Sequence, residues 1–482
     1  MDQYSSATYS PIELEGRKQG TCCQYCMKED SSESWYISSS RLRVDDYGIL
    51  MKRGWRRRGT RVYKPLNDIT CCPAHPIWCD TMRFRILSAY KKVVSVLEAY
   101  LRDGIVPERL PCGIPDPQEA AELKEPGENE DQTQRQMHRR PEADKENGYD
   151  PGTKVTPEKA AEPFLAKNHE WNQQPKIEWK KLEELEDYMK RVEKREGDVH
   201  TLEVRVCSCS PLSPEINATL RDEHEMFNKC FSRVYTLGSG GMSLEEFQET
   251  YVKTPLVNIH DKKVEAAGAP KFGTYHQQYW LDGAKMIAVS VVDLLPGCLS
   301  SVCFFYNPRY SFLKLDTFSA LWEIAYVRNL QRTYGGTAPA YANLRYYTRG
   351  YYFCPPSKLN YNRLYLPSYL TCPLTYTLVA LGRCKRRLNR NKHNQLSLAT
   401  VGDPLPIPPD KEVTVQLPFS ENLISLLIKG SYTVEDDAVV TKLAVARDLL
   451  YESDLKLIDQ WIHLVRNTGN MRIVCRNWVG ML

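Results

Sequence analysis

The chain has 482 residues, 42% of them hydrophobic, which is enough for two or more domains with buried cores. Its first ten residues lack a basic start and an apolar run, so we expect no signal peptide. The sixteen cysteines then predict reduced thiols in a cytoplasmic protein and exclude a disulfide framework. The net charge of +4 combines −6 over residues 116–163 (13 acidic, 7 basic) with +10 elsewhere, which permits a polyanionic partner without identifying one.

Residues 1–20 are predicted to form a disordered lead-in, and residues 21–104 a compact module rich in Cys and Arg. The module ends in a helix that Ser88 can cap and Gly104 terminates. The apolar stripe of this helix, at helical spacing, consists of Tyr90, Val93, Val94, Leu97, Tyr100 and Leu101.

An acidic linker and a charged helix are expected next. Residues 105–170 are rich in Pro, Glu and Gln and contain few large apolar side chains, so burial cannot offset their chain entropy and we expect a flexible linker. Residues 171–200 carry a helical apolar pattern from Lys176 to Glu196, and most of the remaining positions there are Lys or Glu.

Residues 201–482 are predicted to form a larger domain with a C-terminal extension. Its expected elements are a strand at 201–206, helices at 222–234 and 243–251 (the second with a capping box at Ser243), a helix from Asp316 or Thr317 to Gln331, a strand at Arg345–Phe353 and a final helix near Leu455–Val465. This alternation predicts an α+β fold, with a mixed central sheet flanked by helices.

A buried hairpin is predicted at the centre of this domain. Two apolar runs, Met286–Leu294 and Leu299–Tyr306, are joined by the turn signal Pro296-Gly297. A transmembrane helix needs about 20 uninterrupted apolar residues. Asp293 and the turn interrupt this stretch, so we reject the membrane-spanning interpretation. The polar and aromatic residues just before the hairpin favour an active-site wall.

The N-terminal cysteines indicate a metal site. Cys23 and Cys26 form a C-x-x-C pair, which places two thiolates on one turn and suits a soft metal. Cys71 and Cys72 follow, and Pro73 supplies a kink that would let neighbouring cysteines share a metal. Four thiolates suit zinc or an iron–sulfur cluster. His75 and Cys79 remain open as alternatives to the second pair, and buried structural cysteine is the alternative for all of them.

A basic segment lies between the two cysteine pairs. Residues 41–65 hold nine Lys or Arg against two Asp, with Trp among them. Such a mixture can bind phosphate and stack a base, although a solvated basic face explains the charge equally simply. Residues 383–392 hold six basic residues and no acid, which suits a tRNA backbone, a nuclear-import patch or a plain loop.

Several motifs, in this order along the chain, resemble those of the eukaryotic arginyl-tRNA–protein transferases. They are CQYC (23–26), RGWRRRGTRVYKP (53–65), TCCP (70–73), GTYHQQYWLDG (273–283), IAVSVVDLLPGCLSSVCFFYNPRYSFLKL (287–315), FSALWEIAYVR (318–328) and YLPSYLTCP (365–373). The resemblance covers both modules and spares the linker.

The resemblance implies transfer of arginine from Arg-tRNA to the α-amine of proteins that begin with Asp, Glu or oxidised Cys, which marks them for ubiquitin-dependent degradation. It also implies a GNAT-like acyltransferase fold for the catalytic half. The matching cysteines, implicated in metal or iron–sulfur binding in that family, are Cys23, Cys26, Cys71 and Cys72.

The chain departs from the family pattern at several positions. Asn307 stands where the family has Asp, and Trp322 and Trp78 stand where it has Arg. A His-Ser-Cys segment is replaced near residues 354–356, and a Lys-Tyr-Gln reads as residues 229–231, Lys-Cys-Phe. Loss of two arginines would weaken binding of tRNA or acidic substrates. The alternative interpretation is therefore an impaired paralogue that binds tRNA or acidic N-termini without transfer.

The chemistry of such a transfer narrows the choice of catalytic groups. An aminoacyl ester is already activated, so a covalent enzyme intermediate is not required. A positioned carbonyl, a stabilised oxyanion and a base for the attacking amine are required. The candidates within the matching motifs are His276, Asp282, Asp293 and Glu323. One carboxylate would also pair with the guanidinium of the arginine, and the sequence does not assign the two roles.

Substrate-binding candidates come from the same motifs. Gln277 and Gln278 can donate to a carbonyl or a ribose hydroxyl, and Tyr279 lies beside them. Arg328, Arg349 and Lys358 are candidate cations for the acidic side chain of the acceptor. Residues 341–376 hold nine tyrosines interleaved with cations, a composition that suits the unpaired acceptor end of a tRNA. Tyr347 and Tyr351 are the two selected from that set.

Overall fold

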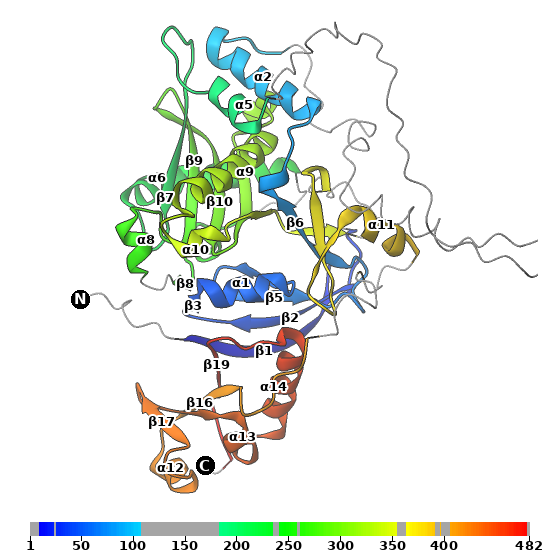
Figure 1. Cartoon of the computed structure of the whole chain (residues 1–482), viewed down its shortest axis with the longest axis vertical. Coiled ribbons are helices and arrows are strands. Elements are labelled where there is room, and N and C mark those ends of the chain that lie inside the picture. The colour runs from blue at the N-terminus through cyan, green and yellow to red at the C-terminus, as the bar shows by residue number, and fades with distance from the viewer. Residues whose placement is uncertain are drawn as a thin grey trace, which may run out of the picture. The chain divides into compact units, whose positions relative to one another are not determined.

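The computed structural model describes residues 9–23, 26–107, 183–234, 241–257, 261–353, 363–390, 396 and 405–479 (Figure 1). Among these residues, those up to 107 and those from 184 onward belong to one compact unit. Nearly all of the predicted linker lies outside the described residues, and so do Lys358 and residues 354–356. Of the predicted charged helix, the described part is α5 (Leu185–Arg191).

A nine-stranded sheet forms the centre of the unit. Its order is β15-β14-β6-β12-β11-β10-β9-β7, and β13 pairs with β6 beside this path. The strands are β6 (Ala74–Asp80), β7 (Leu202–Ser208), β9 (Gly273–Leu281), β10 (Lys285–Leu295), β11 (Cys298–Tyr306), β12 (Tyr346–Thr348), β13 (Tyr351–Phe353), β14 (Ser368–Thr371) and β15 (Leu378–Ala380).

The predicted hairpin is confirmed as β10 and β11, which pair antiparallel from Leu295–Cys298 to Ala288–Tyr306. Gly297 closes its turn with φ of +96°, a conformation that side chains other than glycine rarely adopt. The single strand predicted at residues 345–353 is instead the two short strands β12 and β13, because Arg349 and Gly350 interrupt the pairing. Within the described part of the chain, every helix is too short or too polar to cross a bilayer.

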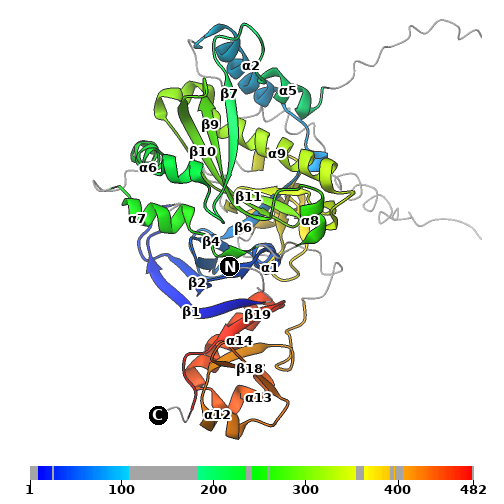
Figure 2. The same cartoon turned by 90° about the vertical axis from the view of Figure 1, so that its left-hand side faces the viewer.

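Two helices cover opposite faces of this sheet (Figure 2). Side chains alternate between faces along β9, so His276 contacts α6 (Pro214–Val234), whereas Gln277 shares its face with Ser290, which contacts α9 (Leu315–Tyr334). The expected cap of α9 at Asp316 or Thr317 is wrong, because the helix starts at Leu315 and Lys314 occupies the N-cap in a left-handed conformation.

The N-terminal region supplies part of the central sheet. Strand β6 pairs with β12 and with β14, so it lies between two strands of the downstream domain. All seven of its residues are buried. The division at residues 21–104 and 201–482, drawn from composition, therefore does not coincide with the sheets that the chain forms.

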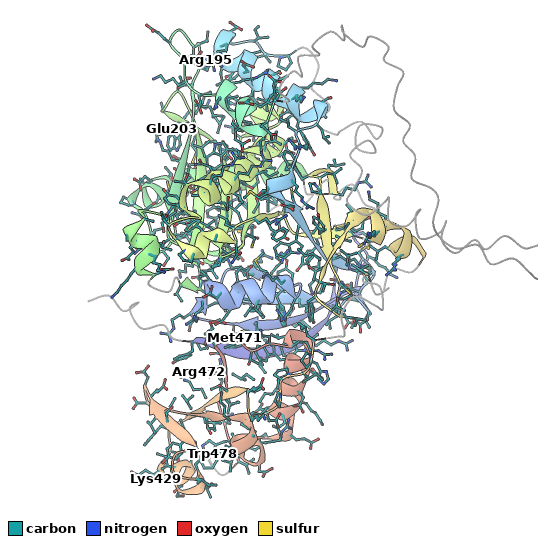
Figure 3. All side chains as sticks on the ribbon, in the orientation of Figure 1. Arg195, Glu203, Lys429, Met471, Arg472 and Trp478 are labelled. Carbon is teal, nitrogen blue, oxygen red and sulfur yellow. The ribbon has the colours of Figure 1, made fainter. Side chains whose placement is uncertain are left out.

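A second sheet of eight strands joins the two ends of the chain, in the order β17-β18-β16-β19-β1-β2-β5-β4. Its strands are β1 (Ser10–Thr21), β2 (Ser32–Ser38), β4 (Arg56–Arg58), β5 (Arg61–Pro65), β16 (Thr414–Pro418), β17 (Tyr432–Glu435), β18 (Ala438–Lys442) and β19 (Met471–Val474). The expected disorder of residues 1–20 is wrong for β1, because Ile12 is fully buried and Ser10 pairs with Met471, which is labelled in Figure 3.

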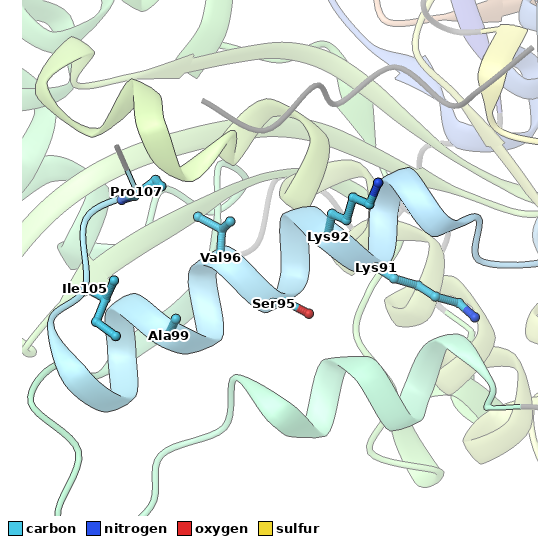
Figure 4. Close-up of a pocket in the computed structure, with 7 residues that line it drawn as sticks. All are labelled: Lys91, Lys92, Ser95, Val96, Ala99, Ile105 and Pro107. Carbon is cyan, nitrogen blue, oxygen red and sulfur yellow. The ribbon is translucent and has the colours of Figure 1, made fainter. Parts of the chain in front are cut away.

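Helix α2 (Ser88–Asp103) confirms the predicted apolar stripe, since every residue of that stripe is buried. The helix ends at Gly104, whose φ is +68°, as expected, but it begins at Ser88 with Leu87 at the N-cap. A hollow lies on the outer side of α2 (Figure 4), and none of the candidate site residues lines it.

The remaining elements are shorter or lie at the edges of these sheets. Strand β3 (Leu42–Arg43) pairs with β8 (Leu256–Val257). The α-helices are α1 (Val44–Lys52), α7 (Leu244–Phe247), α8 (Lys262–Ala266), α10 (Pro339–Ala342), α11 (Leu381–Arg390), α12 (Glu421–Leu426), α13 (Leu443–Ala446) and α14 (Glu452–Val465). Three short 3₁₀ helices, η1 (Thr81–Arg83), η3 (Pro308–Leu313) and η5 (Arg447–Leu449), and one π-helix, η2 (Gln248–Val252), are also described. The capping box expected at Ser243 is confirmed at the start of α7.

Candidate metal centre and buried acidic site

Four cysteines from two distant segments meet in one cluster. The sulfur atoms of Cys23, Cys26, Cys71 and Cys72 all lie within 4.8 Å of one another, and those of Cys26 and Cys71 are 3.5 Å apart. The two segments are held together by the amide of Cys71, which donates to the carbonyl of Ser31 over 3.0 Å.

A tight turn shapes the first cysteine pair. The amide of Cys23 donates to the carbonyl of Lys28 at 2.9 Å, and the amide of Met27 donates to the carbonyl of Cys23 at 2.8 Å. A hydrogen bond to the backbone of Lys28, with a contribution from Cys71, lowers the pKa of Cys26 to about 7. A thiol with this pKa readily gives the thiolate that metals bind.

The donor set fits a metal. A tetrahedral ion with metal–sulfur bonds of about 2.3 Å places its sulfurs about 3.8 Å apart, and the spacing of the cluster brackets that value. The prediction of these four cysteines is supported to this extent: together they can hold a metal ion. His75 and Cys79, the alternatives to the second pair, are buried on β6 in the central sheet, and neither belongs to this group of four sulfurs.

A second group of polar side chains is buried where β9, β10 and β12 face α9. We call it the Glu323 cluster, and it consists of Gln277, Tyr279, Ser290, Glu323 and Tyr347. The hydroxyl of Ser290 donates to one carboxylate oxygen of Glu323 at 2.5 Å. All five side chains are buried, with at most 2% of each exposed.

Several polar atoms of the Glu323 cluster make no well-formed hydrogen bond with any described residue. They are both side-chain polar atoms of Gln277 and the hydroxyl of Tyr279. The side chains of Tyr347 and Ser301, in contrast, interact with the Glu323 carboxylate and oppose the rise of its pKa. Buried polar atoms are nearly always paired, and leaving one unpaired costs about 1–3 kcal/mol. A concentration of such atoms in one place is typical of a site that binds something else.

Burial sets the protonation of this cluster. Desolvation raises the pKa of Glu323 above its usual value, although Arg349 and the Ser290 hydroxyl oppose the shift. Burial likewise raises the pKa of Tyr279 and of Tyr347 well above the usual range. The tyrosines therefore stay neutral, and Glu323 can exchange a proton nearer to neutral pH than an ordinary glutamate.

The Glu323 cluster adjoins the point where β12 ends, since Tyr347 lies one residue before its last residue. Strand β12 runs parallel to β11 and pairs with it only along Cys298–Ser300. Beyond that point Ser301 and the rest of β11 pair, among the described residues, with β10 alone. A cavity of about 10 Å³, the space of one water molecule, lies next to Tyr347 and Arg349.

His276 lies on the other face of the sheet and is fully buried. Its Nδ1 atom lies 2.7 Å from Glu223 on α6, and its Nε2 atom lies 3.0 Å from the carbonyl of Tyr251. Burial lowers the pKa of His276, but the charges of Glu223 and Cys209 and the hydrogen bonds to both together outweigh that effect and hold the pKa well above its usual value. Gln278 belongs to the same network, since its amide donates to Glu223 at 2.7 Å and to Thr219 at 2.8 Å.

The two aspartate candidates lie apart from both groups. Asp293 forms a fully buried ion pair with Arg57, through two contacts of 2.7 and 2.6 Å, and Thr274 donates to it at 2.8 Å. Asp282 lies in the exposed turn after β9, where it accepts from the amide of Thr201 at 2.8 Å and contacts His200 at 2.9 Å. The four catalytic candidates thus occupy four separate environments.

Two of the remaining substrate-binding candidates are committed to contacts within the protein. The guanidinium of Arg328 donates to the carbonyls of Thr81 and Phe84 and pairs with Glu186 at 2.9 Å. The hydroxyl of Tyr351 donates to the carbonyl of Gly54 at 3.0 Å.

Sequence reasoning missed the partners of these candidates. Glu223 and Arg57 each lie more than 50 residues from the side chain they pair with. Nothing local in the sequence announces either pairing. For Ser290 the available signal is that it is a polar residue within the largely apolar run Met286–Leu294.

Three of the positions expected to depart from the family pattern, Trp322, Asn307 and Trp78, lie outside the Glu323 cluster. Trp322 stacks on Tyr326, with ring centroids 5.0 Å apart. Asn307 accepts from the amide of Arg309 and so caps η3. The indole of Trp78 donates to the hydroxyl of Thr371 at 2.8 Å. Each of the three therefore has a structural contact of its own.

The structure thus defines a mixed α/β protein with a cluster of four cysteines that can hold a metal ion and with a sheet that holds the buried Glu323 cluster. The family description for the N terminus of arginine-tRNA-protein transferases matches residues 21–92, and that for the C terminus matches residues 222–372. The first range contains all four cysteines and the second contains Glu323. The chain belongs to the arginyl-tRNA–protein transferase family, which confirms the resemblance seen in its motifs.

Similar proteins extend over most of the chain. Arginyl-tRNA–protein transferase 1 of Drosophila melanogaster is 29% identical, over 79% of this chain and 84% of the relative. Its namesake in Arabidopsis thaliana is 26% identical, over 81% of this chain and 77% of the relative. An aspartate/glutamate leucyltransferase of Pseudomonas fluorescens is 34% identical, over 19% of this chain and 33% of the relative.

Proposed function

We propose that this chain transfers arginine from Arg-tRNA to the N-terminal α-amine of proteins that begin with Asp, Glu or oxidised Cys, and so marks them for ubiquitin-dependent degradation. The observation that carries the proposal is the match of both family descriptions, in order, on one chain whose relatives of that name align over about four fifths of it.

We further propose that residues 201–482 contain a GNAT-like acyltransferase domain and that residues 21–104 form a separate functional module. These two ranges describe functional parts of the chain, because β6 of the first range pairs with strands of the second. The support is topological. From β7 to β11 the strands are antiparallel neighbours, and then helix α9 leads to β12, which is parallel to β11. One parallel pair inside an otherwise antiparallel sheet, flanked by helices, makes this the kind of mixed sheet that the predicted fold requires.

Within this fold, Glu323 is the proposed proton acceptor. Its raised pKa suits a general base working near neutral pH, because the proton-transfer driving force is best when the two pKa values are close. The Ser290 hydroxyl donates to one carboxylate oxygen, and Oε2 is the oxygen that we assign to take the proton of the attacking amine. Tyr279, Tyr347 and Gln277 supply neutral donors that can hold the ester carbonyl and its oxyanion.

Arg349 is the proposed cation for the acidic side chain of the acceptor. It directly follows β12, its charge acts on the Glu323 carboxylate, and its Nη1 atom donates to the carbonyl of Asp316 at 2.9 Å. Arg328 is unsuited to this role because its guanidinium is already paired with Glu186 and two carbonyls. His276 and Asp293 act, in this proposal, as positioning residues that fix β9 to α6 and β10 to β4.

For the metal, we propose a single tetrahedral zinc ion in preference to an iron–sulfur cluster. The ligating sulfurs of a cluster bind different irons and therefore lie farther apart than those of one shared ion. Here the four sulfurs lie within 4.8 Å. Zinc at this site would fix β1 and β2 to the loop before β6. Elemental analysis of anaerobically purified protein should give one zinc per chain, whereas a visible charge-transfer band would indicate a cluster.

The alternative is a paralogue that binds tRNA or acidic N-termini without transfer, and it is favoured by the tryptophans and asparagine found where the family has Arg and Asp. Both proposals are tested by supplying charged tRNA and peptides that differ only in their first residue. Label on Asp and Glu peptides, but not on Asn or Gly peptides, supports the transferase. Binding of charged tRNA without label supports the paralogue.

A further inference from the structure

Three cationic side chains from distant parts of the chain meet around the ring of Tyr376. The guanidinium carbon of Arg53 and the Nζ atom of Lys64 each lie 5.2 Å from the ring centroid. Arg466, at the C-terminal end of α14, is near enough to act on the pKa of both Lys64 and Tyr376. We call these four residues the Tyr376 cation cluster. It lies outside the Glu323 cluster and the cysteine site.

The positive charge of this cluster is not balanced. None of its three cations forms an ion pair with a carboxylate among the described residues; their hydrogen bonds go to neutral oxygens. Lys64 donates to the carbonyl of Leu464 at 3.2 Å, and Arg53 donates to the carbonyl of Ile49 at 3.1 Å. Carbonyl oxygens satisfy donors but do not neutralise charge.

Burial makes this imbalance costly. Arg53 is 8% exposed, and its Nε atom makes no hydrogen bond within the described part of the chain. Desolvation, together with the charges of Arg53 and Arg466, lowers the pKa of Lys64 to about 7, and the exposed Asp68 offsets only part of that shift. Buried like charges repel one another, and a bound anion would compensate that repulsion.

We infer that the Tyr376 cation cluster binds a phosphate group, with Arg53, Lys64 and Arg466 as its ligands. The planar guanidinium groups suit the oxygens of a phosphate, and the ammonium group of Lys64 adds a point charge. The phosphate can come from a tRNA backbone or from free phosphate, and the tRNA source rests on the proposed function.

The first arm of the test uses inorganic phosphate and needs no tRNA. Phosphate should raise the melting temperature of the wild-type chain by at least about 2 °C over chloride at equal ionic strength, since a ligand that binds only the folded state stabilises it. Lys64→Met keeps the aliphatic stem but removes the charge, and it should abolish the rise. Lys52→Met is the matched control, because Lys52 is exposed and lies one residue before Arg53.

The second arm uses uncharged tRNA and measures the slope of log affinity against log salt. Lys64→Met and Arg466→Met should each reduce the slope by about 1, and Lys52→Met should not. A reduced slope assigns the site to a tRNA phosphate. An unchanged slope, with the phosphate effect lost in the variants, assigns it to free phosphate. Because neither arm involves transfer, failure of the proposed arginine transfer leaves this result readable.

The inference is overturned if inorganic phosphate leaves the melting temperature of the wild type unchanged while the tRNA salt slope is the same in wild type and variants. It is equally overturned if Lys64→Met and Arg466→Met keep the full phosphate effect. If Lys64→Met does not fold, Arg466→Met decides alone, since its half-buried side chain bonds only neutral carbonyls, those of His463 and Leu405, among the described residues.

Discussion

Replacing Asp293 by Asn separates a structural role from a catalytic one. The carboxylate has no exposed area, and it receives two hydrogen bonds from Arg57, at 2.7 and 2.6 Å, and one from Thr274 at 2.8 Å. Asparagine keeps the shape but leaves the Arg57 guanidinium as an uncompensated buried charge. Breaking a buried pair in this way costs about 3–5 kcal/mol, so we expect a loss of that size in the free energy of unfolding.

The assay is urea denaturation of Asp293→Asn alongside two comparison variants. Asp45→Asn is the surface control, because the side chain of Asp45 is 46% exposed and lies 3.7 Å from Arg43, and it should cost less than about 1 kcal/mol. The double variant Arg57→Met/Asp293→Leu removes both charges and should be more stable than Asp293→Asn alone. A loss below about 1 kcal/mol in Asp293→Asn, combined with abolished transfer, would refute the structural role and make Asp293 a catalytic group.

Three further predictions concern the other candidate residues. Glu323→Gln should lower kcat by about 10²–10⁴-fold with normal folding. In the wild type, the rate of transfer should rise with pH through a pKa above the usual glutamate value. The free energy of unfolding should fall over the same pH interval, because the folded state keeps the proton of Glu323 to a higher pH than the unfolded state does. A flat pH–rate profile would contradict the role of Glu323 as the base. Cys23→Ala/Cys26→Ala should lose the bound metal by elemental analysis, and full retention of metal would contradict the assignment. The ion pair of His276 and Glu223 should stabilise the fold fully below about pH 6.5, the usual His pKa, and this stabilisation should be lost as pH rises through the raised pKa of His276. Glu223→Gln should remove this pH dependence of the melting temperature. A variant that keeps the same pH dependence would count against the pair.

Local features of the sequence predicted much of the fold. The hairpin at β10 and β11 follows from apolar runs joined by Pro296-Gly297, and the stripe on α2 follows from helical spacing ending at Gly104. Ser243 shows its capping box within four residues. In each case the interacting residues lie close together along the chain, so the local sequence pattern is enough to predict the interaction.

Long-range pairing defeated the same reasoning. Polar-looking β1 becomes a strand only because β19, some 460 residues later, and β2 pair with it. Strand β6 enters the central sheet between segments nearly 300 residues downstream. Tertiary contacts also override local capping at α9, where Lys314 replaces the expected Asp316 or Thr317.

The candidate site was predicted in parts. The C-x-x-C motif announced Cys23 and Cys26, whereas the choice of Cys71 and Cys72 over His75 and Cys79 needed the fold. Glu323 was one of four catalytic candidates of equal standing in sequence. Burial and the partner Ser290 distinguish it, and neither can be read from composition or spacing.

The most direct test of the central proposal is a comparison of donors. Anaerobically purified chain would be incubated with one peptide that begins with Asp and with either labelled Arg-tRNA or labelled Leu-tRNA. The account predicts label on the peptide from Arg-tRNA and none from Leu-tRNA. Label from Leu-tRNA would assign the chain the donor named for the Pseudomonas fluorescens relative, and no label from either donor would contradict arginine transfer itself.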